Sequence, residues 1–217
     1  MQAPVILFQD QRFVVLDKPA GLPVHAGPAG GRSVEDWFPL LSRRKDGPWL
    51  AHRLDADTSG CLVIALRRAA LLAAQALFAS GAVCKTYWAV VAGWVEGDRG
   101  SVNAPLLKVS DKTGWRMTTG PKGQNAVTDW RVLGRSDGLT WLELRPRTGR
   151  THQIRVHCLT LGAPILGDER YGRPGGGLHL LARSIHLPLD PAVGATANPP
   201  VHMRDALEQC GFRGVRD

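Results

Sequence analysis

Runs of apolar residues, each about the length of one strand, recur along the chain. Runs of this length that are rich in β-branched or aromatic residues and bounded by turn-forming residues are typical of strands. They occur at residues 5–8, 13–16, 61–66, 83–92, 126–133, 139–145 and 178–187. The run at 61–66 is wholly apolar, which predicts a strand buried in the core.

Longer stretches with helical composition lie between these runs. The clearest extends from Arg67 to Ser80, is rich in Ala and Leu, and is followed by Gly81, a residue that favours the end of a helix. Ser33 is a candidate N-cap for a short helix. The remaining helices are expected at 33–41, 151–161 and 201–210.

The helix expected at 151–161 carries two stripes of different character. Ile154, Cys158 and Leu161 form an apolar stripe that should face the core. His152 and Arg155 lie three positions apart on another stripe, so they should point in the same direction.

Composition adds a strong positive charge to this picture. The chain has 217 residues, 44% of them hydrophobic, which suits one globular domain over 1–217. Its net charge is +8. An excess of this size favours a polyanionic partner such as nucleic acid, although a soluble protein with a merely basic surface is equally compatible. The turn-rich region 94–125, which contains Trp115, is expected to form a hairpin or surface arm.

The cysteines and the N-terminus indicate the compartment. The four cysteines form no C-x-x-C pair, so they are expected to be buried, reduced thiols. No ligand spacing for a metal is found among them or the seven histidines. Because the chain shows no signal peptide and no run of transmembrane length, a cytoplasmic protein is predicted.

The most promising chemistry lies in the loop His52–Gly60, directly before the buried strand. A loop fixed to a core strand can hold a reactive side chain rigidly. Asp55 is a candidate nucleophile, and Arg53 is placed to meet a polyanion. Asp57 is a rival carboxylate at this stage. An ordinary turn made by the Thr-Ser-Gly that follows is the plainer reading.

Tyr87 and Trp88 stand next to each other in the strand expected at 83–92. Alternation along a strand places their rings on opposite faces, so both cannot belong to the same core. Arginines and lysines further along suit phosphate contacts. They are Lys108, Lys112, Arg116, Lys122, Arg147, Arg150 and Arg155.

Residues 52–60 resemble the H-R-L-D-x-x-T-S-G motif of the RluA-type pseudouridine synthases, which isomerise uridine in ribosomal and transfer RNA. Every fixed position matches. Four further segments are similar to motifs of the same family, so the resemblance covers most of the chain. These segments are Asp17–His25, Lys85–Gly93, Thr148–His157 and Pro164–Gly172.

The resemblance implies roles for individual residues. Asp55 would be the nucleophile, Tyr87 the ring that lies against the target base and acts in proton transfer, and Arg155 the cation paired with the catalytic carboxylate. Arg53 would help displace or replace the flipped nucleotide. Asp57 falls at a variable position of the motif and loses its candidacy. The other RNA-binding candidates are Arg147, Arg150 and His152.

The resemblance also implies a fold and a partner. The fold would be α+β, a single catalytic domain with a mixed, mostly antiparallel central sheet flanked by helices and loops, and an active-site cleft across the sheet. No cofactor and no metal are expected. The partner would be structured rRNA or tRNA, bound by a monomer that lacks the extra N-terminal RNA-binding domain of some relatives.

Two alternatives belong to other functional classes. A non-catalytic RNA-binding or RNA-folding protein on the same scaffold would have no need of Asp55, Tyr87 and Arg155 together. A glycoside or nucleoside hydrolase using Asp55 and Asp57 as a carboxylate pair would release free base or sugar, whereas an isomerase leaves the mass of the RNA unchanged.

Overall fold

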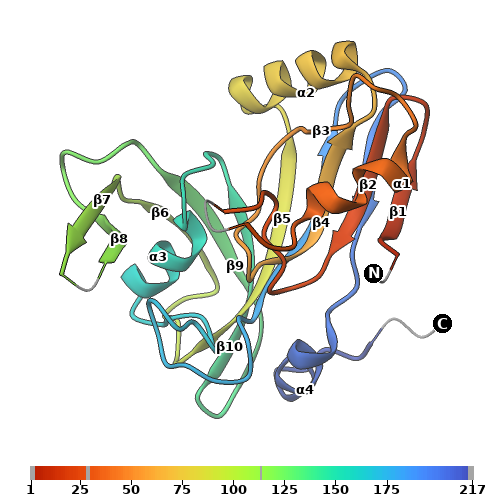
Figure 1. The fold of residues 1–217 in the computed structure, drawn as a ribbon. Coiled ribbons are helices and arrows are strands. Elements are labelled where there is room, and N and C mark those ends of the chain that lie inside the picture. Colours follow the sequence, from red (N-terminus) through yellow and green to blue (C-terminus); the bar gives the residue numbers. More distant parts are fainter. Residues whose placement is uncertain (1–2, 28–29, 113, 215–217) are drawn as a thin grey trace. The chain divides into compact units, whose positions relative to one another are not determined.

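The computed structural model describes residues 3–27, 30–112 and 114–214 (Figure 1). The chain divides into two compact units. Unit 1 comprises the described residues within 1–85 and 181–198, and unit 2 those within 86–180 and 199–217. Each unit is built around its own set of strands.

Unit 1 is centred on β4 (Ser59–Ala65), all of whose residues are buried. Strand β2 (Phe13–Lys18) pairs antiparallel with one edge of β4, and β1 (Val5–Gln9) pairs antiparallel with β2. On the other edge, β11 (Leu180–Leu187) pairs parallel with β4 through its residues Leu181 and Ala182. The apolar run at 61–66 is buried along its whole length, as predicted.

Short elements complete unit 1. Strand β3 (Trp49–Leu50) pairs with β4, and β12 (Val193–Thr196) pairs with β11, both antiparallel. These two strands were not predicted. The expected short helix after Ser33 is a 3-10 turn, η1 (Val34–Trp37), continued by α1 (Phe38–Leu41).

Helix α2 (Arg68–Ser80) agrees with the prediction to within one residue. Its buried residues Ala70 and Ala74 have small side chains, which allow close packing of the helix on its neighbours. Gly81 ends it in the left-handed conformation at φ 73°, where an L side chain would be strained.

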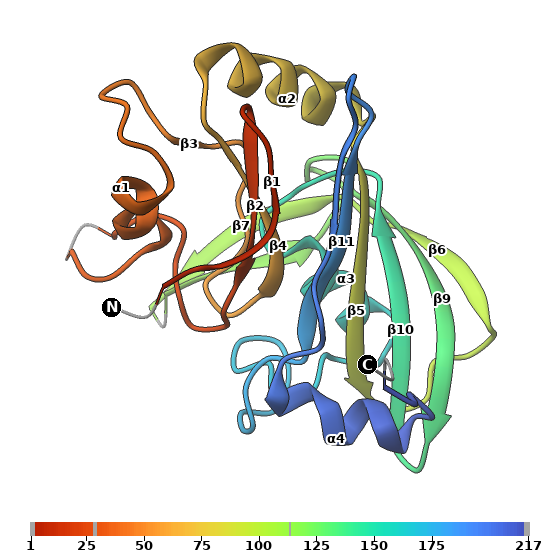
Figure 2. The ribbon, with the colours of Figure 1, turned by 90° about the vertical axis from the view of Figure 1, so that its right-hand side faces the viewer.

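Unit 2 contains an antiparallel set of strands in the order β5, β10, β9, β6, seen side by side in Figure 2. Strands β7 and β8 form a separate antiparallel hairpin, which we call the arm. The bounds are β5 (Cys84–Ala92), β6 (Arg99–Asn103), β7 (Leu106–Asp111), β8 (Gly114–Thr119), β9 (Val127–Ser136), β10 (Leu139–Pro146), α3 (Gln153–Thr160) and α4 (Val201–Gln209). The predicted hairpin at 94–125 therefore exists, but part of that region, β6, joins the larger set of strands.

The core of unit 2 lies between these strands and α3. Ile154 and Cys158 of α3 belong to the buried cluster that contains Ala89 and Leu142, and Leu161 packs against that cluster. The predicted apolar stripe is thus confirmed. The strands of the two units make up a mixed, mostly antiparallel α+β fold, because β4 and β11 pair parallel while the other strand pairs named above are antiparallel.

Candidate active site

The loop His52–Gly60 is held at both ends in unit 1. Leu54 and Thr58 are buried, whereas Arg53 and Asp57 are exposed and Asp55 is half-buried between them. The Thr58 N–H donates to the Asp55 carbonyl at 3.1 Å, which closes a turn around the two carboxylates. The predicted loop directly before β4 is present, and it leaves Asp55 and Asp57 in different surroundings.

Gly60 fixes the end of this loop against β11. Its φ is 104°, and a Cβ there would lie 2.3 Å from the Ala182 carbonyl oxygen. Such an approach is closed to any other residue, so the glycine of the motif is required by the parallel pairing of β4 with β11.

Lys18 ties the loop to the preceding segment of unit 1. Its side chain is fully buried, and its Nζ donates to the carbonyls of Pro19 at 2.8 Å, Leu22 at 2.8 Å and Ala56 at 2.7 Å. The Ala56 carbonyl also accepts the Gly21 N–H at 2.9 Å. Ala56 is the residue after Asp55, so the ammonium group positions the backbone of the candidate nucleophile.

The charge of Lys18 is only partly compensated. Burial lowers its pKa to about 8, while the nearby carboxylates of Asp57 and Asp55 act in the opposite direction. Lys18 was given no role from the sequence, although it belongs to the matching segment Asp17–His25. The sequence feature that could have indicated its role is a lysine at the end of a strand, directly before a proline.

His52 anchors the loop to β4 and α2. Its Nε2 accepts the Val63 N–H at 3.1 Å, and its ring packs on Phe78 with centroids 4.8 Å apart. Burial lowers the pKa of His52 to about 4, with a further contribution from Lys85. The ring is therefore neutral at pH 7, and it acts as a structural acceptor in this loop.

In unit 2, Arg155 is clamped by Asp168. The Nε donates to Oδ2 at 2.8 Å and the Nη2 to Oδ1 at 2.7 Å, with the two side chains 6% and 0% exposed. Burial alone would raise the pKa of Asp168, but the hydrogen bonds and charge of Arg155 and the backbone N–H groups of Tyr171 and Arg170 hold it below its usual value. The plane of the guanidinium is fixed as a result.

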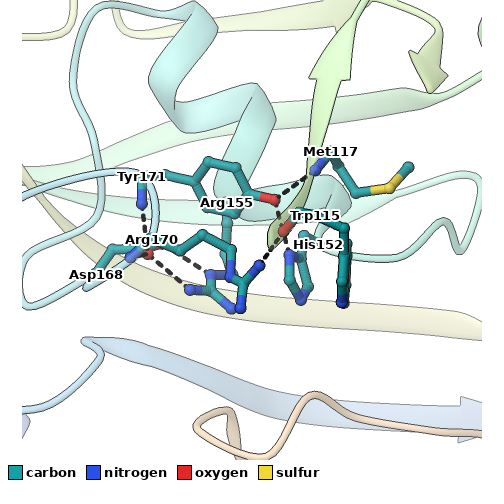
Figure 3. Close-up of polar contacts among 7 residues, drawn as sticks. All are labelled: Trp115, Met117, His152, Arg155, Asp168, Arg170 and Tyr171. Carbon is teal, nitrogen blue, oxygen red and sulfur yellow. Dashed lines mark hydrogen bonds and ion pairs between the residues drawn. The ribbon is translucent and has the colours of Figure 1, made fainter. Parts of the chain in front are cut away.

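Tyr171 connects Arg155 with His152 (Figure 3). The Arg155 guanidinium lies 5.2 Å from the centre of the Tyr171 ring, and the Tyr171 hydroxyl lies 2.8 Å from the Nδ1 of His152. The same hydroxyl accepts the Met117 N–H of the arm at 3.0 Å. His152 and Arg155 thus face one neighbour, as predicted, and Tyr171 joins them to the arm.

The reason given for their common direction was wrong, however. His152 is the N-cap of α3, not a residue inside it, and its backbone has the left-handed conformation with φ 53°. Gly is the usual residue there, and a short-range sequence pattern cannot signal a histidine in this conformation. Its direction is set by the cap and by Tyr171.

Tyr87 and Trp88 lie on opposite faces of β5, as alternation predicted. Tyr87 packs against the core cluster of unit 2, and its partner across the sheet is Leu144. Trp88 makes edge contacts with Trp141 at 4.8 Å and with Phe212 at 5.6 Å. Tyr87 is half-buried, so part of its side chain still contacts solvent.

The remaining RNA-binding candidates lie on the surface. Arg147 makes an exposed ion pair with Asp129, with Nε–Oδ2 2.6 Å, and the Arg150 Nε donates to the Asn125 carbonyl at 3.0 Å. Gln153 beneath them accepts the Arg150 N–H at 3.0 Å. The segment therefore has a buried, structural side and an exposed, basic side.

In the part of the chain that the structure describes, the predicted site residues come together within each unit. Asp55 and Arg53 share one loop of unit 1, while His152 and Arg155 converge on Tyr171 in unit 2. The meeting of Asp55 with Tyr87 and Arg155 is implied by the family resemblance and stays a prediction. Asp168 and Tyr171 were given no role from the sequence, although both stand in the matching segment Pro164–Gly172.

Comparison with known proteins decides the family. The model of the RNA pseudouridylate synthase family matches residues 12–160. The chain belongs to this family. It is 44% identical over 170 residues to an uncharacterized RNA pseudouridine synthase of Zymomonas mobilis, covering 77% of this chain and 78% of that protein. With ribosomal large subunit pseudouridine synthase C of Vibrio cholerae the identity is 38%, over 77% of this chain and 52% of that protein.

A solved structure agrees with the fold. The human RNA pseudouridylate synthase domain containing 4 superposes with a TM-score of 0.79 at 29% identity, covering 95% of this chain and 92% of that one. The predicted family and the α+β fold class are therefore confirmed. The predicted enzyme class, an isomerase that acts on uridine in RNA, is confirmed with them. The chain spans about half the length of several curated relatives, including 40% of a mitochondrial synthase of Arabidopsis thaliana.

Within residues 3–27, 30–112 and 114–214, no three His, Cys, Asp or Glu side chains cluster as they would around a metal ion. No described helix is both long and apolar enough to span a bilayer. Cys84 is exposed, which corrects the expectation of four buried thiols, while Cys61, Cys158 and Cys210 are buried.

Proposed function

We propose that this chain isomerises specific uridines in structured rRNA or tRNA, with Asp55 as nucleophile and no cofactor or metal. The observation that carries the assignment of Asp55 is its setting. It is half-buried in a loop fixed by Lys18 and Gly60, whereas Asp57 in the same loop is exposed. A fixed, partly desolvated carboxylate suits attack at one carbon.

The reaction breaks the bond between the anomeric carbon and N1 of uracil and forms a bond from that carbon to C5. The proton lost from C5 balances the proton gained at N1, so nothing is oxidised and no water is consumed. Asp55 adds to the anomeric carbon or assists an elimination at the ribose. Tyr87 stacks on the detached base and helps remove the C5 proton.

In this scheme Arg155 is the cation that the family resemblance pairs with the catalytic carboxylate, and its role is to orient that carboxylate. Its clamp by Asp168 supports the role, because a cation fixed through Nε and Nη2 can present its remaining edge in one direction only. Arg53, which is exposed beside Asp55, fits the assigned role of replacing the flipped nucleotide.

The RNA partner is chosen by the cost of exposing the uridine. Flipping a base out of its stack costs a few kcal/mol, least in a loop or bulge, so a structured RNA with an unpaired uridine is favoured. A relative of Vibrio cholerae is named for the large ribosomal subunit, which makes large-subunit rRNA the first RNA to test. We place the protein in the cytoplasm as a monomer. We propose that it binds the RNA through Arg53, Arg147, Arg150 and His152.

The assignment is tested with Asp55→Asn and its matched control Asp57→Asn. We expect Asp55→Asn to fold and bind RNA but to lose pseudouridine formation by on the order of 10³-fold or more, as when a nucleophile is removed. Asp57→Asn should retain turnover. The measurement is pseudouridine-specific chemical mapping of rRNA and tRNA treated with each variant. Full turnover by Asp55→Asn would exclude this mechanism.

Intact-mass analysis separates the alternatives from the proposal. The isomerase leaves the RNA mass unchanged while the mapping signal appears. A hydrolase that used Asp55 and Asp57 would release uracil and lower the mass. A non-catalytic RNA-binding protein would shift the RNA in a binding assay and produce neither signal.

A further inference from the structure

Trp115 on the arm is an exposed ring surrounded by cations. It is 36% exposed, with the Lys108 Nζ 4.8 Å and the Arg170 guanidinium carbon 4.9 Å from the ring centre. The His152 ring stacks on it, 5.1 Å away and tilted by 25° (Figure 3). We call Lys108, Trp115, His152 and Arg170 the Trp115 patch. None of the catalytic steps above uses Trp115, Lys108 or Arg170.

The register of the arm explains why the ring stands where it does. Lys108 pairs with Met117 and Ser110 with Trp115, so all four side chains lie on one face of the hairpin. Near the base of that face, Leu106 is buried and Met117 packs beside Tyr171. Farther out, the same face carries Trp115, which is no longer covered by the core.

Docking of the arm does not depend on the indole. The Tyr171 hydroxyl accepts the backbone N–H of Met117, and Arg170 donates from Nη1 to the backbone carbonyl of Trp115. Both contacts use main-chain atoms of the arm. A smaller side chain at 115 would leave them in place, so holding the arm is not a sufficient reason for a large aromatic ring on the surface.

The charge around the ring selects the class of ligand. Residues 106–124 carry Lys108, Lys112, Arg116 and Lys122 against the single acidic residue Asp111. Aromatic rings flanked by lysine and arginine are the means by which proteins bind single-stranded nucleic acid, the ring stacking on a base and the cations meeting phosphates.

We infer that the Trp115 patch is a binding site for an unpaired nucleotide of the RNA substrate, other than the target uridine. The base stacks on Trp115, and Lys108 moves from the ring to the adjoining phosphate, while Arg170 keeps its hydrogen bond to the Trp115 carbonyl and adds positive charge beside the nucleotide. The target uridine already has Tyr87 as its ring, so a second stacking ring serves a second nucleotide. The inference rests on the proposed function for the identity of the RNA, and it concerns RNA regions that are single-stranded.

The test compares Trp115→Leu with Trp94→Leu. Trp94 is a matched control in the same unit, because it is 69% exposed and has the Arg135 guanidinium carbon 4.6 Å from its ring centre. The probes are a short fluorescent single-stranded RNA of mixed sequence and the same RNA as a duplex. Circular dichroism and thermal unfolding of each variant verify that it is folded.

We expect Trp115→Leu to weaken binding of the single strand by roughly 5- to 100-fold, the range that one aromatic–base stack contributes. Trp115→Phe should retain most of the affinity, and Trp94→Leu all of it. Binding of the duplex should change little, because its bases present no free face. Lys108→Gln should reduce the slope of log affinity against log salt by about 0.7, whereas Trp115→Leu should leave the slope unchanged.

Two results would overturn the inference. A wild-type affinity of Trp115→Leu for the single strand would exclude stacking at the patch. Equal losses on single strand and duplex would assign Trp115 to supporting the arm. Both results come from binding measurements and do not depend on turnover. The proposed function is tested separately: it would be excluded if RNA treated with the wild-type protein contained no pseudouridine.

Discussion

At the scale of single residues, two buried cations are stabilised in opposite ways. Lys18 is held by three backbone carbonyls and has its pKa lowered to about 8, mainly by burial. Arg155 is held by a carboxylate that is itself buried. Dipoles compensate a charge less completely than a counter-ion does, so the two residues should respond differently to pH and to substitution.

For Arg155, the prediction concerns its counter-ion. Asp168→Asn removes the charge but keeps the shape, and the buried guanidinium loses its compensation. The free energy of unfolding should fall by about 3–5 kcal/mol, measured by urea denaturation at pH 7. Since the folded-state pKa of Asp168 lies below its usual value, the difference from wild type should shrink as the pH falls through that lowered pKa.

The control is Asp129→Asn, which breaks the exposed and equally bidentate pair with Arg147. Exposed pairs contribute little, so no comparable loss is expected. Similar losses in the two variants would show that burial does not determine the strength of the Asp168–Arg155 clamp.

For Lys18, the prediction concerns pH. Its folded-state pKa of about 8 lies below the ordinary value of 10.5, so the unfolded chain binds more protons between these two values. The free energy of unfolding should therefore rise with pH across that window, relative to Lys18→Met, which has no titrating group there. Thermal unfolding at a series of pH values measures the difference, and parallel curves would contradict the prediction.

At the scale of elements, the pairing of β4 with β11 depends on Gly60. A Cβ at this position would lie 2.3 Å from the Ala182 carbonyl oxygen, and φ is 104°. Gly21 offers a comparison, because its φ of 82° is also in the left-handed region but a Cβ there meets nothing within 4 Å. Strain and clash are thus present together at Gly60, and strain alone at Gly21.

We therefore expect Gly60→Ala to lower the free energy of unfolding by several kcal/mol and Gly21→Ala by about 1–2 kcal/mol, the ordinary cost of the left-handed region. Denaturant titration of both variants makes the comparison. If Gly21→Ala proved the more damaging, the close approach of β4 and β11 would not be the determining contact.

The elements themselves were largely predictable. The apolar run that became β4, the Ala-rich helix α2 with Gly81 after it, and the stripe of Ile154 and Cys158 all follow from local patterns. Strands β3 and β12 were not foreseen, because two to four residues are too few to show a period. The roles of Lys18 and Asp168 were also missed, because their partners are backbone carbonyls in one case and a residue 13 positions away in the other.

At the scale of the whole molecule, the net charge of +8 governs the encounter with RNA. Part of this charge is paired on the surface, as between Arg147 and Asp129, and part surrounds Trp115. Cations that meet phosphates release counter-ions, so the affinity for RNA should fall linearly with salt on logarithmic axes, by about 0.7 per phosphate contact for single strands.

Salt should affect binding more than chemistry. We expect KM for an RNA substrate to rise steeply with salt and kcat at saturating RNA to change little over the same range, because Asp55 and Arg155 are at least partly removed from solvent. Steady-state kinetics at several salt concentrations provide the values. A kcat that fell in parallel with affinity would indicate that the charges of Asp55 and Arg155 are screened by salt as strongly as those on the surface.

The uneven burial of the thiols has a practical consequence. Cys84 is exposed at the start of β5, three residues before Tyr87, and the other three cysteines of the chain are buried. A maleimide dye added to the native protein should therefore attach at one place without any engineered cysteine. The natural sequence already supplies a fluorescent reporter position on the strand that carries the proposed stacking tyrosine.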